Sequence, residues 1–289
     1  MSRVVMIDGK LCAPDAAVVS VFDRGFLYGD SVFETLRTYG GKVFAIGDHL
    51  ERLERSAQRV HIRVPVTRAQ LTEEIAAAIL ASDNTESYVR VMITRGQGEL
   101  GLDPDLAGEP LRVIIVGELH PPSDELRHSG IKTITFKTQR ASDATSAEGA
   151  KIGNYLVAVL AMRAARAAGA AEALIVDGQG RVVEGASSNL FFVSQGSLFT
   201  PGLDLGILAG ITRSRVLEAA AQLGVATSYV APSIAQLVAA DEIFISSSIR
   251  EILGVVQVDE RSIGDGKVGP LTRALFDAFR HNVLRELDV

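Results

Sequence analysis

The chain has 289 residues, of which 47% are hydrophobic and 22% charged, and its formal net charge at pH 7 is −6. These values are typical of a globular protein and exclude a disordered chain, and the length fits one large or two moderate domains. The acidic balance disfavours nucleic-acid binding, because no basic excess can hold a phosphate backbone. The single cysteine, Cys12, excludes an internal disulfide, and no stretch is apolar enough for a signal peptide or a membrane span. We therefore expect a soluble cytoplasmic protein.

The first part of the chain alternates short apolar runs with amphipathic segments. Its patterns predict strands over Arg3–Ile7, Ala17–Phe22, Ser31–Tyr39, Lys42–Ile46, Tyr88–Thr94 and Leu111–Val116. We expect Asp48 and Thr67 to cap helices that reach about Val60 and Ala81. Residues 119–130 are rich in proline, histidine and polar side chains, and we interpret them as a linker. This predicts a small amino-terminal α/β domain over residues 1–118.

A larger domain is expected over residues 131–289. Its predicted strands are Ile131–Phe136, Ala171–Val176, Arg181–Val193 and Glu242–Ser246. Its predicted helices are Asn154–Ala168, Ile211–Leu223, Ile234–Ala239 and Pro270–Leu287. A polar loop is expected from Thr138 to Gly149. Because strands and helices come in runs rather than in strict alternation, the pattern favours the α+β class.

Lysine is scarce, and one of the lysines has unusual neighbours. Lys151 stands between Gly149-Ala150 and Ile152-Gly153, just before a predicted helix. Small neighbours indicate an amine that another group approaches closely, and a desolvated lysine is a good nucleophile. Taken alone, the segment is also compatible with an ordinary solvated lysine in a loop.

Three further segments are candidates for binding chemistry. Glu184 ends an apolar strand beside glycine, so it is either partly buried with a cationic partner or an edge residue facing water. Thr212 follows Gly210 at a predicted helix start, which suits a phosphate but is also compatible with an ordinary helix cap. Ser246–Ser248 follow an apolar strand and add hydroxyl donors, although serine runs are usually turns.

One apparent motif is rejected. Residues 96–101 match the glycine spacing of a dinucleotide-binding loop and follow a predicted strand. That motif requires a helix to begin at the loop, whereas Pro104 and Pro110 interrupt the following residues. The five histidines show no metal-ligand spacing, and we expect no metal site.

Five segments in one order resemble the class IV aminotransferases, which are fold-type IV pyridoxal phosphate enzymes. They are Phe22–Glu34, His49–Leu53, Lys151–Tyr155, Glu184–Phe191 and Gly206–Arg213. The resemblance runs from about Val4 to about Arg280. It implies a two-domain α+β fold with a small α/β domain and a larger pseudobarrel domain. It also implies pyridoxal 5′-phosphate as cofactor, bound between the domains, and a homodimer in which loops of one subunit close the pocket of the other.

The resemblance also assigns roles to the cofactor residues. Lys151 would bind the cofactor covalently and move a proton to and from the substrate α-carbon. Glu184 would keep the pyridine nitrogen protonated, and Arg52 would bind the phosphate as a planar cation. The remaining cofactor contacts are implied for Ile211, Thr212, Ser248 and Tyr155.

The implied substrate residues are Tyr28, Phe33, Thr35, Arg37, Tyr88, Arg90 and Ile249. Aromatic walls suit apolar side chains, and an arginine suits the γ-carboxylate of glutamate. We therefore expect an aminotransferase that moves an amino group between a hydrophobic, branched-chain type amino acid and 2-oxoglutarate. These small molecules are the expected partners, with no nucleic acid and no membrane.

Two alternative activities remain open. Thr35 stands where branched-chain enzymes commonly have glycine, and with Leu203–Leu208 it resembles aminodeoxychorismate lyase. D-amino-acid transaminases carry an arginine and a histidine in the loop after Gly96, and Gln97–Leu102 holds neither. A D-amino-acid transaminase would therefore need an atypical carboxylate site built from other arginines, namely Arg24, Arg37 or Arg90.

Overall fold

The computed structural model describes residues 3–138 and 147–289. The chain divides into two compact units. Unit 1 comprises residues 1–120, 150–154 and 289, and unit 2 comprises residues 121–149 and 155–288. The short segment that carries Lys151 is therefore grouped with the amino-terminal part of the chain, whereas the next residue, Tyr155, belongs to unit 2. Most of the predicted loop Thr138–Gly149 lies outside the described residues.

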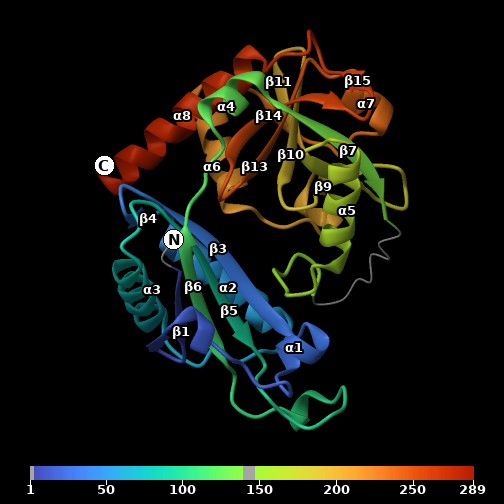
Figure 1. Ribbon diagram of the computed structural model, residues 1–289. Helices are drawn as coiled ribbons and strands as arrows, with labels where there is room; N and C mark the ends of the chain where they lie inside the picture. The colour runs from blue at the N-terminus through green and yellow to red at the C-terminus, as the bar shows by residue number, and fades with distance from the viewer. Residues whose placement is uncertain (1–2, 139–146) are drawn as a thin grey trace. The chain divides into compact units, whose positions relative to one another are not determined.

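Within its described residues, unit 1 is built on a six-stranded antiparallel sheet (Figure 1). The strand order is β2-β1-β6-β5-β3-β4. The strands are β1 (Val4–Ile7), β2 (Lys10–Cys12), β3 (Ser31–Tyr39), β4 (Lys42–Val43), β5 (Ser87–Thr94) and β6 (Arg112–Glu118). Strand β3 has the predicted bounds, because its alternation and the Gly40-Gly41 turn are both strong local signals.

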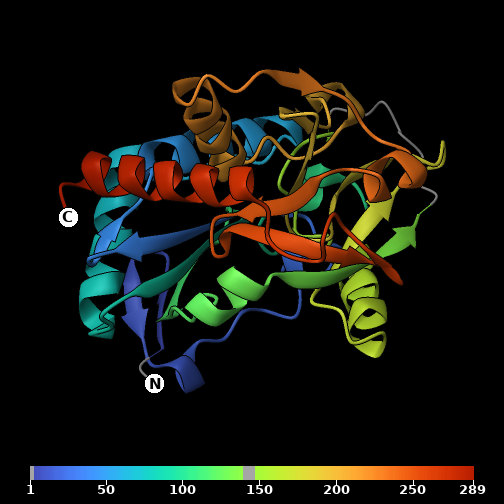
Figure 2. The same ribbon diagram turned by 90° about the horizontal axis from the view of Figure 1, so that it is seen from above.

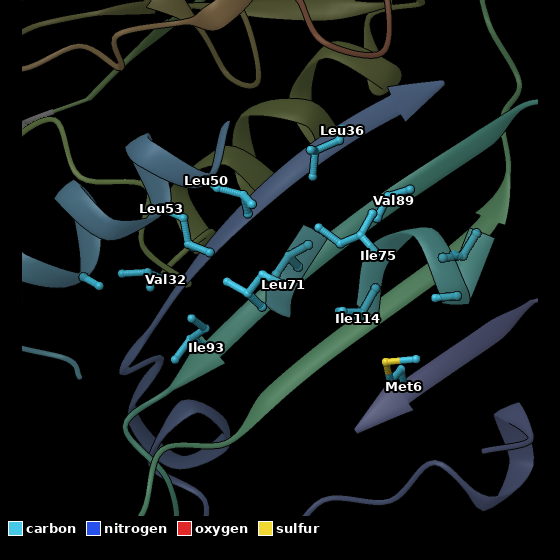
Figure 3. Packing of buried hydrophobic residues seen from close by; sticks show 14 of the residues in the cluster. Met6, Val32, Leu36, Leu50, Leu53, Leu71, Ile75, Val89, Ile93 and Ile114 are labelled. Atoms are coloured by element: carbon cyan, nitrogen blue, oxygen red, sulfur yellow. The ribbon is translucent and has the colours of Figure 1, made fainter. Parts of the chain in front are cut away.

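Two helices, α2 (Ile46–Arg59) and α3 (Arg68–Ser82), pack on one face of this sheet. Figure 3 shows the core between these helices and the sheet. Leucines of α2 and residues of α3 contact side chains of β3, β5 and β6 there. The predicted cap of α3 is confirmed, since Thr67 and Gln70 form a capping box. The predicted cap of α2 is wrong by three residues: Ala45, not Asp48, is the N-cap, and the helix begins at Ile46.

The predicted strand Ala17–Phe22 is not formed. A 3₁₀ turn (η1, Pro14–Ala16) precedes it, and Asp23 then caps the short helix α1 (Arg24–Tyr28). Most of the apolar side chains of this segment are exposed, and β2 lies at that edge of the sheet. An apolar run without a neighbouring strand to pair with cannot satisfy its backbone as a strand, so tertiary context overrides the local propensity.

Unit 2 contains a nine-stranded sheet within its described residues, with strand order β12-β11-β10-β13-β14-β7-β8-β9 and β15 paired to β14. The strands are β7 (Ile131–Lys137), β8 (Glu172–Val176), β9 (Val182–Gly185), β10 (Asn189–Ser194), β11 (Ser197–Thr200), β12 (Thr227–Tyr229), β13 (Glu242–Ser247), β14 (Glu251–Val258) and β15 (Arg261–Ser262). Strand β7 runs parallel to both β14 and β8. The predicted strand Arg181–Val193 is divided into β9 and β10, because residues 186–188 form a turn.

The helices of unit 2 are α4 (Asp124–Ser129), α5 (Leu156–Ala167), α6 (Ile211–Gln222), α7 (Ile234–Val238) and α8 (Pro270–Leu287). A further 3₁₀ turn, η3, spans Leu203–Leu205. Figure 2 shows α8 as the long red helix that leads to the carboxyl terminus, and its bounds are those predicted. The α+β class is thereby confirmed. No helix among the described residues is long and apolar enough to span a membrane.

Candidate functional site

The backbone around Lys151 is fixed to β3 and α2. The Lys151 carbonyl accepts a hydrogen bond from the Phe33 N–H at 3.0 Å, and the Lys151 N–H donates to Ser56 Oγ at 3.1 Å. Gly153 N–H donates to the Ser31 carbonyl at 2.8 Å. A Cβ at Gly153 would lie 2.2 Å from Ser31 Oγ, so this close approach requires glycine. The small neighbours of Lys151 thus allow the segment to lie against the sheet.

The Phe33 ring brings two predicted site residues together. The Lys151 amine lies 4.5 Å from the ring centroid, and the Arg90 guanidinium carbon lies 3.8 Å from it. Both distances permit cation–π attraction, and the ring itself is buried. Two cationic groups therefore gather over one aromatic side chain in unit 1, which is an arrangement suited to an anionic ligand.

Five of the predicted substrate residues lie on one face of the unit 1 sheet. Side chains alternate along a strand, and the even-numbered residues Val32 and Leu36 of β3 belong to the core with α2 and α3. The opposite face carries the odd-numbered side chains of β3 and the even-numbered side chains of β5. Thr35 is directly paired with Arg90 across β3 and β5, and Arg37 with Tyr88. The predicted residues on this face are Phe33, Thr35, Arg37, Tyr88 and Arg90.

Arg52 forms a buried cluster with two residues of its own unit. Its Nε and Nη2 donate to the two carboxylate oxygens of Glu34, each at 2.7 Å. The second of these oxygens also lies 2.7 Å from His49 Nδ1. All three side chains are buried, and Glu34 is fully so. The bidentate pair fixes the plane of the guanidinium, which is the geometry that a phosphate-binding arginine requires.

The titration of this cluster follows from burial and from its neighbours. Burial raises the pKa of Glu34, but the charge and hydrogen bonds of Arg52, together with His49, outweigh burial and lower the pKa to about 2. Burial also lowers the pKa of His49, and although Glu34 opposes this shift, Arg52 and Lys151 add to it. At neutral pH the cluster therefore holds an ionised Glu34 and a neutral His49, which donates through Nδ1.

Tyr28 lies in the short helix α1 beside a loop of unit 1. Its hydroxyl accepts a hydrogen bond from the Gly101 N–H at 3.2 Å, and Arg24 lies over its ring at 5.1 Å. Arg24 itself donates to the carbonyls of Gly101 and Leu102 and to Asp30. This guanidinium is engaged in holding the loop, which disfavours it as the atypical carboxylate site considered for D-amino acids.

In unit 2, Glu184 is connected to the start of α6 through Leu208 and Asn189. The Leu208 N–H donates to Glu184 Oε2 at 3.4 Å, and its carbonyl accepts from Asn189 Nδ2 at 2.9 Å. A Cβ at Gly210, the N-cap of α6, would lie 2.0 Å from Asn189 Oδ1. The close approach of the Asn189 side chain therefore favours glycine at this N-cap position.

The start of α6 has the features of an anion-binding helix end. No side chain among the described residues caps it, and Ile211 and Thr212 are buried. Ser246, at the end of β13, is also buried, and its hydroxyl has no hydrogen-bond partner within the part of the chain that the structure describes. Unsatisfied donors at a helix start, on which the helix dipole acts, favour an anion.

The remaining predicted residues of unit 2 lie in two turns. Ser248 and Ile249 belong to the loop between β13 and β14, and both are half-buried. Tyr155 is the N-cap of α5. Among the described residues, no group of three or more His, Cys, Asp or Glu is arranged to hold a metal.

Glu34, His49 and Asn189 were not predicted as site residues. A signal for Glu34 was available, because the alternation of β3 places it between Val32 and Leu36 on the core-facing side. A carboxylate at such a position must find cationic or donor partners. Asn189 had no comparable local signal, since its partners come from the distant residues 208 and 210.

The structure shows what the glycine-rich residues 96–101 form. After residues 96–101 the chain forms only a 3₁₀ turn, η2 (Pro104–Leu106), and no α-helix begins at the glycines. The helix that a dinucleotide-binding loop requires is therefore not formed at these residues. The glycines of this segment instead permit close backbone contacts, because a Cβ at Gly96 would lie 1.9 Å from the Glu109 carbonyl oxygen.

Comparisons with known proteins agree with this fold. The family model described as amino-transferase class IV matches residues 31–258. A putative branched-chain-amino-acid aminotransferase of Methanocaldococcus jannaschii is 37% identical over 96% of this chain and 95% of its own. A D-alanine aminotransferase of Bacillus licheniformis is 29% identical over 98% of both chains.

A solved structure extends the comparison to the cofactor. It is a branched-chain amino acid aminotransferase of a T.th. strain, complexed with N-(5′-phosphopyridoxyl)-L-glutamate. This structure matches with a TM-score of 0.90 and 30% identity, and the match covers 97% of this chain and 93% of that one. The chain therefore belongs to the class IV aminotransferases of fold type IV, and it is a pyridoxal-phosphate-dependent transaminase.

Proposed function

We propose that this enzyme transfers an amino group between a branched-chain type amino acid and 2-oxoglutarate. The observation that carries the proposal is the shared sheet face in unit 1, where aromatic side chains and arginines lie together and the Lys151 amine and Arg90 both contact the Phe33 ring. Phe33 and Tyr88 provide apolar surface for a hydrophobic side chain. Arg90 provides a charge for the γ-carboxylate of glutamate, so one face can accept both substrates in turn.

The residues present fit pyridoxal phosphate. Lys151 offers an amine on a fixed backbone, and Arg52 offers a guanidinium held in one plane by Glu34. In unit 2, the start of α6 and the buried Ser246 hydroxyl, which both lack a side-chain partner among the described residues, suit a phosphate. We propose Arg52, Ile211 and Thr212 as phosphate ligands, together with Ser248, which follows Ser246 by two residues. Tyr155 is proposed to contact the ring.

Bound pyridoxal phosphate supplies an electron-withdrawing ring that stabilises negative charge at the substrate α-carbon. Lys151 is proposed to remove the proton from that carbon as a general base, and then to donate it to the cofactor as a general acid. Glu184, which accepts a hydrogen bond from Leu208, is proposed to hold a proton at the pyridine nitrogen. Both tasks require side chains that are fixed in place. The backbone of Lys151 is fixed by its hydrogen bonds to Ser56 and Phe33.

The substrate itself is proposed to contact residues from several elements. Tyr28, Phe33 and Tyr88 line the hydrophobic side chain, whereas Arg37 and Arg90 are available for a second carboxylate. Thr35 lies opposite Arg90 on the same sheet face, and Ile249 is proposed to contribute a backbone donor. Both guanidiniums stack on an aromatic ring, but Arg37 is also buried and donates through Nε to the Thr38 carbonyl at 3.4 Å. Arg90 is half-buried, and it is therefore the better candidate for glutamate.

A homodimer is part of the proposal. Helix α5 exposes four apolar side chains, and burying such a patch against a second copy would remove it from water. The exposed residues are Leu156, Val157, Val159 and Leu160. In a dimer with twofold symmetry, each copy would bury the same α5 surface.

The test is a set of single-substrate half-reactions with the holoenzyme, followed by the visible absorption of the bound cofactor. We expect L-leucine and L-glutamate each to bleach the band, and D-alanine to leave it unchanged. Bleaching by D-alanine alone would favour a D-amino-acid transaminase instead. Release of pyruvate from aminodeoxychorismate without bleaching by L-leucine would favour the lyase.

A further inference from the structure

The loop that joins β13 to β14 ends on a residue with an unusual backbone conformation. Ser247 pairs with Glu251 across the hairpin, so the loop consists of Ser248, Ile249 and Arg250. Glu251 has a φ of 60°, in the left-handed region. At the end of a short hairpin loop this conformation is ordinarily taken by glycine, because a side chain makes it costly. A glutamate here needs compensating interactions.

Two arginines from different helices hold the buried carboxylate of Glu251. Arg127 of α4 donates through Nη2 to Oε2, and Arg280 of α8 donates through Nη1 to Oε1 at 2.9 Å. Arg127 also donates through Nη1 to the carbonyls of Arg250 and Ile252, at 3.3 and 3.4 Å. One guanidinium thus binds the carboxylate and the backbone on either side of it, so the ion pairs and the left-handed conformation support each other.

Arg250 fixes the same loop from another direction. Its Nη2 donates to Glu172 Oε2 at 2.6 Å and to Ser187 Oγ at 2.8 Å, and its Nε donates to Ser247 Oγ at 3.3 Å. Glu172 is fully buried at the start of β8, and Ser187 lies in the turn after Glu184. The loop therefore has ion pairs on two sides, to α4 and α8 through residue 251 and to β8 through residue 250.

We propose that Glu251 is a positioning residue for ligand binding. Its ion pairs with Arg127 and Arg280 set the backbone of the loop that presents Ser248 and Ile249. This inference rests on the proposed function, which assigns those two residues to the phosphate and the substrate. A binding group displaced by about 1 Å can cost roughly a hundredfold in rate, so a residue that touches neither ligand can still control both.

Glu251→Gly is the decisive variant, because glycine adopts the left-handed conformation freely but has no carboxylate. We expect the Kd for pyridoxal phosphate, measured from the visible absorbance of dialysed holoenzyme, to rise on the order of tenfold. The KM for the amino acid should rise in parallel, and the visible circular dichroism of the bound cofactor should change. These readouts report on the position of the loop rather than on folding alone.

Glu242→Gln is the matched control. Glu242 is likewise a buried glutamate of unit 2, and it accepts hydrogen bonds from the backbone of Leu271 and Thr272 at the start of α8. This variant should lower Tm while Kd, KM and the dichroism stay at wild-type values. Arg280→Met is a second test of the ion pairs that hold Glu251, which we call the clamp. The Arg280 side chain is 38% exposed, so its loss should leave the fold intact. Arg280→Met should shift Kd and KM in the same direction as the glycine variant, by a smaller factor.

Wild-type Kd and KM in both Glu251→Gly and Arg280→Met would overturn the inference, whatever the change in Tm. Ser248→Ala separates this result from a failure of the proposed function. If Ser248→Ala changes Kd while the two clamp variants do not, only the positioning role is wrong. If Ser248→Ala also leaves Kd unchanged, the assignment of Ser248 to the phosphate is wrong as well.

Discussion

Glu34 is a fully buried carboxylate on the core-facing side of a strand, and its partners decide its charge. Arg52 binds both of its oxygens, and His49 binds one of them. A buried ion pair is costly to break by removing one partner, because the other charge is left without compensation. The cluster therefore keeps Arg52 in one orientation, which suits a residue proposed to bind a phosphate.

The same cluster predicts how stability depends on pH. Burial lowers the pKa of His49, so the unfolded chain takes up a proton near the ordinary value of 6.5 while the folded chain does not. The free energy of unfolding should therefore fall as the pH falls below about 6.5, by at most about 1.4 kcal/mol per pH unit from this group. His49→Asn should show a flatter dependence between pH 7.5 and 5.5 in urea unfolding. Parallel curves for the variant and the wild type would contradict this.

Glu34 adds to the same trend at lower pH. Its pKa of about 2 lies below the ordinary 4.5, so its contribution is fully present above pH 4.5 and is lost as the pH falls toward 2. The two groups therefore act in different pH ranges, and a measurement confined to pH 7.5–5.5 reports on His49.

Arg90 is proposed to bind the γ-carboxylate of glutamate, the proposed amino donor. Arg90→Ala should raise the KM for glutamate by about 10- to 100-fold, because a charge-assisted hydrogen bond to the γ-carboxylate is lost. The leucine half-reaction should change much less, since leucine has no second carboxylate. Arg68→Ala, which removes an exposed arginine of α3, serves as the control. Equal losses for both substrates would place Arg90 at the α-carboxylate or in the scaffold.

At the scale of elements, the proposed site depends on strand alternation and on one helix start. Strand β3 directs Glu34 to one face of the sheet, toward α2, and Phe33 and Thr35 to the other. A single strand thus supports the residue that orients Arg52 and also the residues proposed to line the substrate. A shift of register by one residue would exchange the two sets, so the hydrophobic core of unit 1 also fixes the chemistry.

The start of α6 gives a prediction for a single methyl group. Gly210→Ala should weaken pyridoxal phosphate binding by at least about tenfold, because the new Cβ would lie 2.0 Å from Asn189 Oδ1 and displace the helix start. Gly178→Ala is the matched control, since a Cβ there meets nothing within 4 Å. Equilibrium dialysis of both variants measures the effect. An unchanged Kd in Gly210→Ala would mean that α6 does not hold the phosphate.

Local signals determined how well each element could be predicted. Strand β3 and helix α8 were predicted with their observed bounds, because alternation, a glycine turn and a proline at the helix start are local features. The apolar run Ala17–Phe22 was predicted as a strand, but no strand among the described residues pairs with it. Strand β14 was not predicted, since Gly254 interrupts its pattern and its pairing partners come from distant parts of the chain.

The site shows the same division. The small residues around Lys151 indicated a close approach, and the structure shows Gly153 against Ser31. The clustering of Phe33, Arg90 and Lys151 could not be derived from spacing, because the three residues come from positions far apart in the sequence. Which residues share a sheet face follows from alternation only once the register of β3 with β5 is known.

At the scale of the whole molecule, the chain folds as two compact units, and the proposed cofactor residues are shared by both. Lys151 and Arg52 belong to unit 1, whereas Glu184 and Thr212 belong to unit 2. Neither unit carries the complete proposed set. The proposed activity is therefore a property of the full chain rather than of one unit.

We predict that the protein forms a homodimer in solution. The mass in solution should be twice the 30.8 kDa of one chain, because α5 exposes an apolar surface that a second copy can bury. Val159→Glu places a charge in this patch and should shift the protein toward the monomer in sedimentation equilibrium. Leu80→Glu, at an exposed position on α3, is the control. A monomeric wild type at micromolar concentration would contradict the dimer.

The most direct test of the site is to identify the residue that binds the cofactor covalently. The chain has six lysines, at positions 10, 42, 132, 137, 151 and 267, so peptide mapping can distinguish them without ambiguity. Borohydride reduction of the yellow holoenzyme should fix the cofactor to Lys151, and Lys151→Ala should bind it only non-covalently and lose turnover. A reduced adduct on Lys132 or Lys137 would contradict the assignment, and with it the site built around Phe33 and Arg90.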